Sequence, residues 1–210
     1  PPTPLAPDAD TPEWRALREQ QRVRFEEERR QMRRIAEAGD RSEPPSVTID
    51  ATRALIVGVI PHTQCVPRRE ACGFCTFPHD APSPLGRSHM IGAVCGDIER
   101  LTSHAPLKGR SVEAIYLGGG TANLSTPAQV NELVKALARH LRIEDAELTL
   151  EGTPRLFEGL FFSHLKNLAE LPVGQRRISM GIQTFDDGFL RLMGRERFGD
   201  DALVRKLVKR

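Results

Sequence analysis

Short apolar segments alternate with polar, helix-like segments through most of the chain. The apolar segments span residues 54–60, 111–117, 146–150 and 177–182. Most of them are rich in aliphatic residues, which is typical of β-strands. The first, residues 54–60, has no charged or hydrogen-bonding side chain, so it predicts a strand that is buried on both faces.

The segments that follow these strands have the features of helices. Helices are predicted over residues 88–104, 126–141, 154–171 and 186–193, and a further helix is predicted from Asp200 to the end of the chain. Thr126 and Gln129 form a capping-box pattern at the start of the second of these helices. The repeated strand–helix order predicts a parallel sheet with right-handed crossovers.

The number of repeats bounds the fold. The strand–helix units occupy about 160 residues, whereas a complete eight-stranded barrel needs roughly 250 residues. The sequence therefore predicts an α/β fold, either an open sheet or a partial (β/α) barrel truncated after about four units. A helix that runs to Arg210 favours a fragment of a barrel. In either architecture, functional groups are expected at the carboxyl ends of the strands.

The first part of the chain differs from the rest in composition. Residues 1–11 hold four prolines and predict an extended tail. Residues 42–46 contain a further pair of adjacent prolines and predict a linker. We therefore divide the chain into residues 1–46, with tail, helix and linker, and residues 47–210, the core domain.

A charged helix is predicted between the tail and the linker, from Pro12 to Ala38, because proline is favoured at the first helical position. Arg22 with Glu26, and Glu26 with Arg30, are four residues apart and can pair on one face. We interpret this segment as a solvated helix that packs lightly on the domain. The alternative is an arm that binds a partner or RNA. Its basic residues would be Arg29, Arg30, Arg33 and Arg34.

Composition excludes several classes of protein. The 210 residues carry 30 basic and 28 acidic side chains, and this net charge of +2 makes nucleic acid an unlikely partner. Aromatic residues make up 5% of the chain, fewer than base stacking on single strands requires. The sequence has no apolar run near the ~18 residues of a membrane span, and its first residues have no secretory pattern. We expect no membrane association.

Three cysteines lie close together after the first predicted strand. Cys65, Cys72 and Cys75 supply three thiolates within eleven residues, which favours metal or redox chemistry over disulfides. One interpretation is a structural zinc site that His62 or His79 completes. The other is an iron–sulfur cube that three cysteines hold, with one iron open to a substrate or cofactor. The spacing alone leaves both open.

Other polar or glycine-rich positions follow the remaining strands. Gly118, Gly119 and Gly120, followed by Thr121, let the backbone approach a ligand and present N–H groups to an anion. Glu151 and Gln183 end the third and fourth strands, where they can hydrogen-bond a hydroxyl or amino group of a ligand. Cys95 lies apart on a predicted helix and is interpreted as a small core residue.

Taken in order, these segments resemble the radical S-adenosylmethionine superfamily. The features that carry the resemblance are the three-cysteine loop, Tyr116 to Thr121, Leu148 to Pro154 and Arg177 to Asp187. Within that superfamily, the chain resembles the branch of oxygen-independent coproporphyrinogen III dehydrogenase, with its haem-chaperone and radical-methylase relatives. The similarity covers about residues 53–199. It implies a partial barrel of the radical S-adenosylmethionine type, and an oxidoreductase or methyltransferase activity.

The resemblance also implies cofactors and site residues. Cys65, Cys72 and Cys75 would hold a [4Fe-4S] cluster whose open iron binds S-adenosylmethionine, which is cleaved to a 5′-deoxyadenosyl radical that takes hydrogen from an organic substrate. The other residues implied in binding that cofactor are Phe74 near the adenine, Gly118, Gly119, Gly120 and Thr121 near the methionine amino group, Glu151 and Gln183 near the ribose or methionine, and Arg195 at the methionine carboxylate.

The sequence departs from that branch at the cysteine loop. Its first two cysteines are separated by six residues instead of three, and Val59 stands where the branch carries tyrosine. These departures leave the substrate open. The alternatives are coproporphyrinogen-oxidase-like chemistry, a radical C-methylase or cyclopropanase, a haem chaperone, and a zinc-stabilised binding module. An electron donor such as flavodoxin or ferredoxin, a small-molecule substrate and a cytoplasmic setting are expected.

Overall fold

The computed structural model describes residues 50–66 and 80–209, single residues between them (Cys72, Cys75 and Phe77), and scattered residues from Pro12 to Arg34. Within α4, side chains 159–162 are left out of the description. The predicted tail and linker lie outside the described residues, and so does Phe74.

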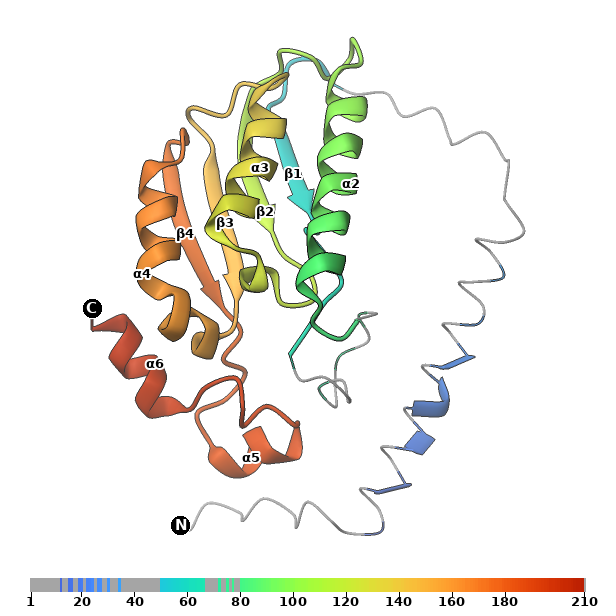
Figure 1. Ribbon diagram of the computed structural model, residues 1–210, viewed down its shortest axis with the longest axis vertical. Coiled ribbons are helices and arrows are strands. Elements are labelled where there is room, and N and C mark those ends of the chain that lie inside the picture. The colour runs from blue at the N-terminus through green and yellow to red at the C-terminus, as the bar shows by residue number, and fades with distance from the viewer. Residues whose placement is uncertain are drawn as a thin grey trace.

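Four parallel strands form one sheet in the order β1-β2-β3-β4 (Figure 1). They are β1 (Leu55–Val59), β2 (Val112–Leu117), β3 (Glu147–Gly152) and β4 (Gln175–Met180). Each strand pairs with the next one along the chain. Every connection between strands contains a helix, as the sequence predicted for parallel strands.

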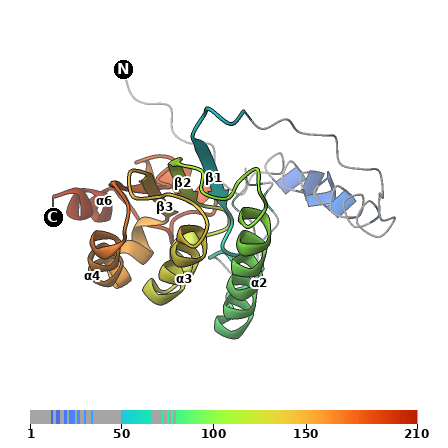
Figure 2. The ribbon, with the colours of Figure 1, turned by 90° about the horizontal axis from the view of Figure 1, so that it is seen from above.

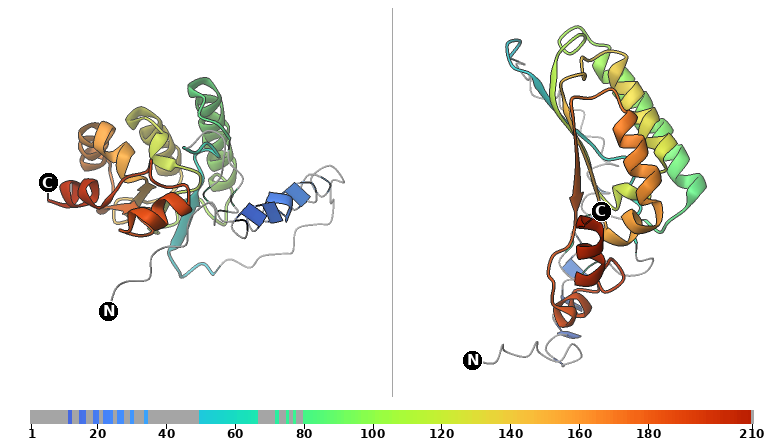
Figure 3. Two further views of the ribbon diagram at one scale, coloured as in Figure 1. Left: turned by 90° about the horizontal axis from the view of Figure 1, so that it is seen from below. Right: turned by 90° about the vertical axis from the view of Figure 1, so that its left-hand side faces the viewer.

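The helices α2 (Pro84–Thr102), α3 (Pro127–Ala138) and α4 (Pro154–Glu170) cover one face of the sheet (Figure 2). Seen edge-on, the sheet has these helices on one side (Figure 3, right). The core lies between them and the strands. It includes Leu133 and Leu137 of α3 and Leu148 and Leu150 of β3, all at most 1% exposed. Burial of these side chains, at about 25 cal/mol per Å² of apolar surface, is the main stabilising term of this layer.

The prediction that the first strand is buried on both faces is wrong. Ile56 is 77% exposed and Gly58 is also exposed, whereas Val59 is buried. The apolar run has this mixed burial because β1 is an edge strand and the described helices all lie on the other face of the sheet (Figure 2). The run is apolar on both faces, but only one of them contributes to the described core.

Capping side chains explain where the helices begin. Ser83 accepts a hydrogen bond from Gly86 N at the start of α2, so this helix begins four residues earlier than predicted. The predicted capping box of Thr126 and Gln129 is present in α3. Asp186 caps α5 (Asp187–Leu192) and Asp200 caps α6 (Asp201–Val208). The α6 helix ends at Val208 and does not run to the last residue.

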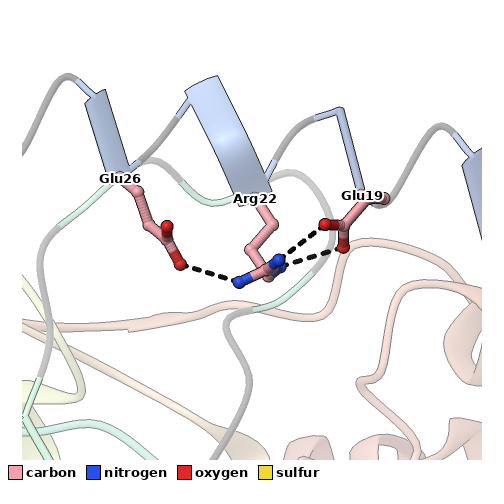
Figure 4. Close-up of polar contacts among 3 residues, drawn as sticks. All are labelled: Glu19, Arg22 and Glu26. Carbon is pink, nitrogen blue, oxygen red and sulfur yellow. Dashed lines mark hydrogen bonds and ion pairs between the residues drawn. The ribbon is translucent and has the colours of Figure 1, made fainter.

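The described residues between Pro12 and Arg34 are helical, in agreement with the predicted charged helix. Arg22 lies 2.8 Å from Glu26, as predicted, and 2.5 Å from Glu19 on the other side (Figure 4). Arg30 lies 3.9 Å from Glu27. These exposed pairs each contribute less than about 1 kcal/mol to stability. Among the described residues, no helix has the length and apolar character needed to cross a membrane.

A buried amide joins the turn after β2 to the end of β3. The side chain of Asn123, in the short helix η1 (Ala122–Leu124), donates to Thr153 O at 3.1 Å and accepts from Thr153 N at 3.2 Å. A Cβ on Gly152 would lie 2.0 Å from Asn123 Cγ, so only glycine fits between them. This contact fixes two of the loops that carry candidate site residues.

Replacing Gly152 with alanine is therefore expected to lower the free energy of unfolding by roughly 2 kcal/mol or more, since the added methyl group overlaps a fully buried side chain. Urea unfolding followed by circular dichroism measures this change. The control is Gly92→Ala on the exposed side of α2, where a Cβ meets nothing within 4 Å. Alanine is the better helix former, so the control should stabilise the protein slightly. Equal stability of the two variants would contradict the proposed overlap.

Candidate functional site

The carboxyl ends of the four strands bring the predicted site residues to one edge of the sheet. The cysteine loop follows β1, Gly118–Thr121 follows β2, and Gln183 follows β4. Glu151 is the last residue but one of β3. Arg195 follows α5 and is buried, at 7% exposed. Phe74 is outside the described residues, so its predicted role stays a prediction.

Hydrogen bonds close the base of the cysteine loop. Asp80 N donates to Thr63 O at 3.0 Å, and Cys65 N donates to Asp80 O at 3.1 Å. The Thr63 hydroxyl also donates to the Asp80 carboxylate, at 2.6 Å. The first cysteine is therefore held at a fixed point beside the end of β1, although Thr63 and Asp80 are seventeen positions apart in the sequence.

The glycine turn packs directly on this loop. Thr121 N donates to Gln64 O at 2.9 Å, and the Thr121 hydroxyl lies 2.9 Å from the Cys65 thiol. Gly120 has a φ of +54°, and a Cβ there would lie 2.6 Å from Gln64 O. The glycine is therefore required for the close approach of two backbones. The predicted contact of this turn with a ligand amino group stays a prediction.

The other two thiols of the cluster and Arg195 act electrostatically on Cys65. Burial raises the pKa of the Cys65 thiol, and the negative charges of Cys72 and Cys75 raise it further. The hydrogen bond from Thr121 and the charge of Arg195 act in the opposite direction. Cys75 N donates to Cys72 O at 2.8 Å, so these two cysteines share a turn. The fold thus brings the predicted thiol cluster together with one cation.

Arg195 links the cysteine loop to the end of β4. Its Nη1 lies 3.2 Å from Cys72 Sγ, and its Nη2 donates to Gly181 O at 2.6 Å. The guanidinium also stacks on the Phe198 ring, at 4.2 Å from the ring centre. A planar group held by three different partners has a fixed orientation, which is the property that bidentate recognition of a carboxylate requires.

Gln183 and Glu151 lie beside this arginine and the glycine turn. Gln183 has a φ of +70°, the left-handed region that non-glycine residues adopt rarely and often at functional sites. A Cβ on Gly181 would lie 3.2 Å from Arg195 Nη2 and 3.5 Å from Gln183 Nε2, so both side chains border this glycine. A Cβ on Gly118 would lie 2.7 Å from a carboxylate oxygen of Glu151.

The histidines of the zinc alternative are placed differently. His62 is 1% exposed, and burial together with the charge of Arg87 lowers its pKa to about 4. His79 is outside the described residues. Within the described part of the chain, no three His, Cys, Asp or Glu side chains converge as ligands of one metal ion. An iron–sulfur cube binds its cysteines through separate irons, so it does not require such convergence.

Three contributors to the site were not predicted. Gln64 accepts from Ser83 N through its side chain and so ties the cysteine loop to α2. Asn123 fixes the turn between β2 and α3. Tyr116 lies beside Glu151, and burial, together with the charge of Glu151, raises the pKa of the tyrosine. Alternation along β2 places Tyr116 on the face opposite the buried Leu117, and that signal was available in the sequence.

A search of protein families matches residues 60–207 to the radical SAM superfamily. The matched range begins one residue after β1 and extends into α6, so it contains β2, β3 and β4 and the loop that follows β1. It also contains all three clustered cysteines and Arg195.

Several curated proteins are similar to this chain. Radical S-adenosyl methionine domain-containing protein 1, mitochondrial, from Mus musculus is 28% identical over 163 residues, which are 77% of this chain and 34% of that protein. Heme chaperone HemW from Haemophilus influenzae is 30% identical, over 60% of this chain and 33% of that protein. Oxygen-independent coproporphyrinogen III oxidase from Escherichia coli is 37% identical, over 52% of this chain and 23% of that protein.

The fold is similar to a solved structure from the same group. Coproporphyrinogen III oxidase (HemN) from Escherichia coli, a radical SAM enzyme, superposes with a TM-score of 0.54 and 28% sequence identity. The match covers 74% of this chain and 33% of that protein. The chain thus spans about a third of the length of the curated relatives it matches, or less. The four-stranded sheet corresponds to part of a barrel, as the sequence predicted.

The buried state of His62 generates a pH prediction for the metal-free protein. Its folded-state pKa of about 4 lies below the ordinary value of about 6.5. The unfolded chain therefore takes up a proton between pH 6.5 and 4 that the folded chain excludes, and stability falls as the pH falls through that window. Urea unfolding should show a loss of roughly 2 kcal/mol from this residue between pH 7 and pH 5.

The variant His62→Gln removes this titration, so its stability should depend less on pH. His164 is also buried and its pKa is also lowered by burial, so some dependence remains in that variant. The exposed His104 is the control, and His104→Gln should keep the full pH dependence. If His62→Gln and His104→Gln give the same pH profile, the assignment of the effect to His62 is wrong.

Proposed function

This chain belongs to the radical SAM superfamily, and on that premise we propose that it holds a [4Fe-4S] cluster and S-adenosylmethionine and abstracts hydrogen from an organic substrate. The observation that carries the proposal lies at the carboxyl edge of the sheet, where Arg195 contacts the Cys72 thiol at 3.2 Å and Cys75 shares a turn with Cys72. The Cys65 thiol lies close enough to Cys72, Cys75 and Arg195 for their charges to shift its pKa. The specific substrate is not part of the proposal.

The donor set fits the cluster. Two further thiols, those of Cys72 and Cys75, lie near the Cys65 thiol, and the charge of the buried Arg195 acts to lower the pKa of Cys65. We assign Cys65, Cys72 and Cys75 as its ligands. When bound, the cluster supplies the electron that cleaves S-adenosylmethionine to a 5′-deoxyadenosyl radical. The protein's own residues then have to hold the cofactor, orient it and exclude water.

The surrounding residues have the chemistry for those tasks. Arg195 has a fixed, planar guanidinium suited to the methionine carboxylate. Gly118 has the carboxylate of Glu151 beside it, so this part of the edge offers an acceptor for an amino group or ribose hydroxyls. Gln183 contributes an amide whose position is fixed by a left-handed backbone. We propose that these side chains bind S-adenosylmethionine.

A haem chaperone is the second candidate. Relatives named heme chaperone HemW occur repeatedly among the similar proteins, two of them 30% identical to this chain over about 60% of its length. In this case the fold and the cluster site would be kept while the activity is haem delivery. Haem binding without formation of 5′-deoxyadenosine by the reduced protein would favour this candidate over the enzyme.

The proposed cluster also constrains partners and compartment. Reductive cleavage of S-adenosylmethionine consumes an electron, so the cluster needs an electron donor, and we propose a flavodoxin or ferredoxin for that role. It also needs a reducing compartment, such as the cytoplasm. The name of the similar protein from Mus musculus places that protein in mitochondria, so the cytoplasmic assignment of this chain remains a proposal.

The cluster is tested by anaerobic reconstitution of the full chain. We expect ~4 iron ions and matching sulfide per chain. Dithionite reduction should give a low-temperature electron paramagnetic resonance signal that changes when S-adenosylmethionine is added. Cys72→Ser should lose most of the iron and the signal.

Cys95→Ser is the matched control for this experiment. Cys95 lies on α2, partly buried against the core, so its replacement should leave the iron content and the signal unchanged. Stoichiometric zinc in place of iron would falsify the proposal and support the zinc-stabilised binding module. A cluster that does not respond to S-adenosylmethionine would restrict the site to structure or electron transfer.

A further inference from the structure

The hydroxyl of Thr121 lies against the thiol of the first cysteine in the cluster. Thr121 Oγ1 is 2.9 Å from Cys65 Sγ, although the two residues are 56 positions apart in the sequence. Thr121 is 2% exposed, so water has almost no access to it and its hydroxyl needs a partner within the protein. Among the residues that the structure describes, Cys65 provides that partner.

The chemistry of the two groups fixes the direction of this hydrogen bond. In the metal-free protein, the Cys65 thiol donates to Val66 O at 3.4 Å, so the Thr121 hydroxyl supplies the hydrogen between its oxygen and the sulfur. A thiolate that binds iron has no hydrogen of its own. The hydroxyl is therefore also the donor in the cluster-bound protein. Because a hydroxyl carries acceptor lone pairs as well, this bond is compatible with the predicted contact to an amino group.

Backbone hydrogen bonds hold both residues in register. Gln64, which precedes Cys65, accepts from Thr121 N at 2.9 Å, and Cys65 N donates to Asp80 O at 3.1 Å. The Gln64 side chain is 2% exposed and pairs twice with the backbone of Ser83: its Nε2 donates to Ser83 O at 2.9 Å, and its Oε1 accepts from Ser83 N at 3.0 Å. The contact between hydroxyl and sulfur therefore belongs to a rigid part of the site.

A hydrogen bond to a cysteine sulfur favours the reduced form of an iron–sulfur cluster. Reduction adds one electron, and part of its negative charge lies on the sulfurs, where a donor stabilises it. The effect is strongest where water is excluded, as it is at Thr121. Arg195 also contacts a sulfur, that of Cys72, but we assign its guanidinium to the cofactor carboxylate as well. The Thr121 hydroxyl contacts its sulfur without any cofactor.

We propose that Thr121 is a positioning residue that raises the reduction potential of the cluster through its hydrogen bond to Cys65. Gln64 holds the two backbones in the register that this bond requires. The cluster takes its one electron from an external reductant, and no bond of the protein forms or breaks in this step. The inference rests on the proposed function, because it requires Cys65 to bind the cluster.

A redox titration of the reconstituted full chain tests this assignment. Dithionite reduction is followed by low-temperature electron paramagnetic resonance without S-adenosylmethionine, so an effect on cofactor binding cannot contribute. Thr121→Val removes the hydroxyl and keeps the shape of the side chain. At a fixed solution potential, its ratio of reduced to oxidised cluster should be about ten-fold lower than in wild type, which corresponds to a midpoint ~59 mV more negative. Thr121→Ser keeps the donor and should restore the wild-type potential.

Two further variants make the result specific. Thr121→Ala differs from Thr121→Ser only in the hydroxyl, so this pair repeats the comparison without the added methyl group of valine. It should show the same negative shift. Thr102→Val is the matched control, since Thr102 is also buried and its hydroxyl donates at 2.7 Å to Ile98 O within α2, outside the site. This control should keep the wild-type potential.

The proposal is overturned if the variants without the hydroxyl keep the wild-type potential, or if Thr121→Ser shifts as far as Thr121→Ala. It is also overturned if both hydroxyl-free variants lose the cluster, since Thr121 would then act on cluster assembly and not on the potential. In each of these cases wild type still holds its cluster, so the proposed function stands. A wild-type chain that takes up zinc and no cluster refutes the proposed function, and this inference with it.

Discussion

The parallel alignment of four strands is the constraint on which the candidate site depends. Because all four strands point the same way, four loops that are far apart in the sequence meet at one edge. Cys65, Thr121, Glu151 and Gln183 come from four different loops or strand ends. The sheet fixes where the loops lie, and the side chains of the loops supply the thiols and polar groups of the site.

Contacts between loops convert this proximity into a defined geometry. The Thr121 hydroxyl meets the Cys65 thiol, and Arg195 spans from Cys72 to the carbonyl of Gly181. Burial makes a thiolate costly, and the arginine offsets part of that cost. The same cation that acts to lower the pKa of Cys65 is the group that we assign to the cofactor carboxylate, so one arginine would serve two negatively charged partners.

The sequence predicted the fold more completely than the site. Periodicity and capping residues were sufficient for the strand–helix order, since Thr126, Asp186 and Asp200 act locally. Whether a strand is covered on one face or two depends on distant segments, and for this reason the prediction for β1 was wrong. The family resemblance implied a role for Arg195 in cofactor binding. The contact of Arg195 with Cys72 joins residues 123 positions apart, so no local sequence pattern predicts it. Asn123 was missed for the same reason, because its partner Thr153 belongs to another loop.

The two edges of the sheet differ in a way that bears on self-association. In the described part of the chain, β4 forms one edge and carries Arg176 and Arg177, whose charges oppose pairing with another strand. The opposite edge, β1, has the sequence Leu-Ile-Val-Gly-Val and no charge. Free backbone donors and acceptors on an apolar edge of this kind are a template for strand addition. Aggregation of the isolated domain would therefore begin at β1, and the charge of a lysine in place of Ile56 would oppose pairing of β1 with a strand of another molecule.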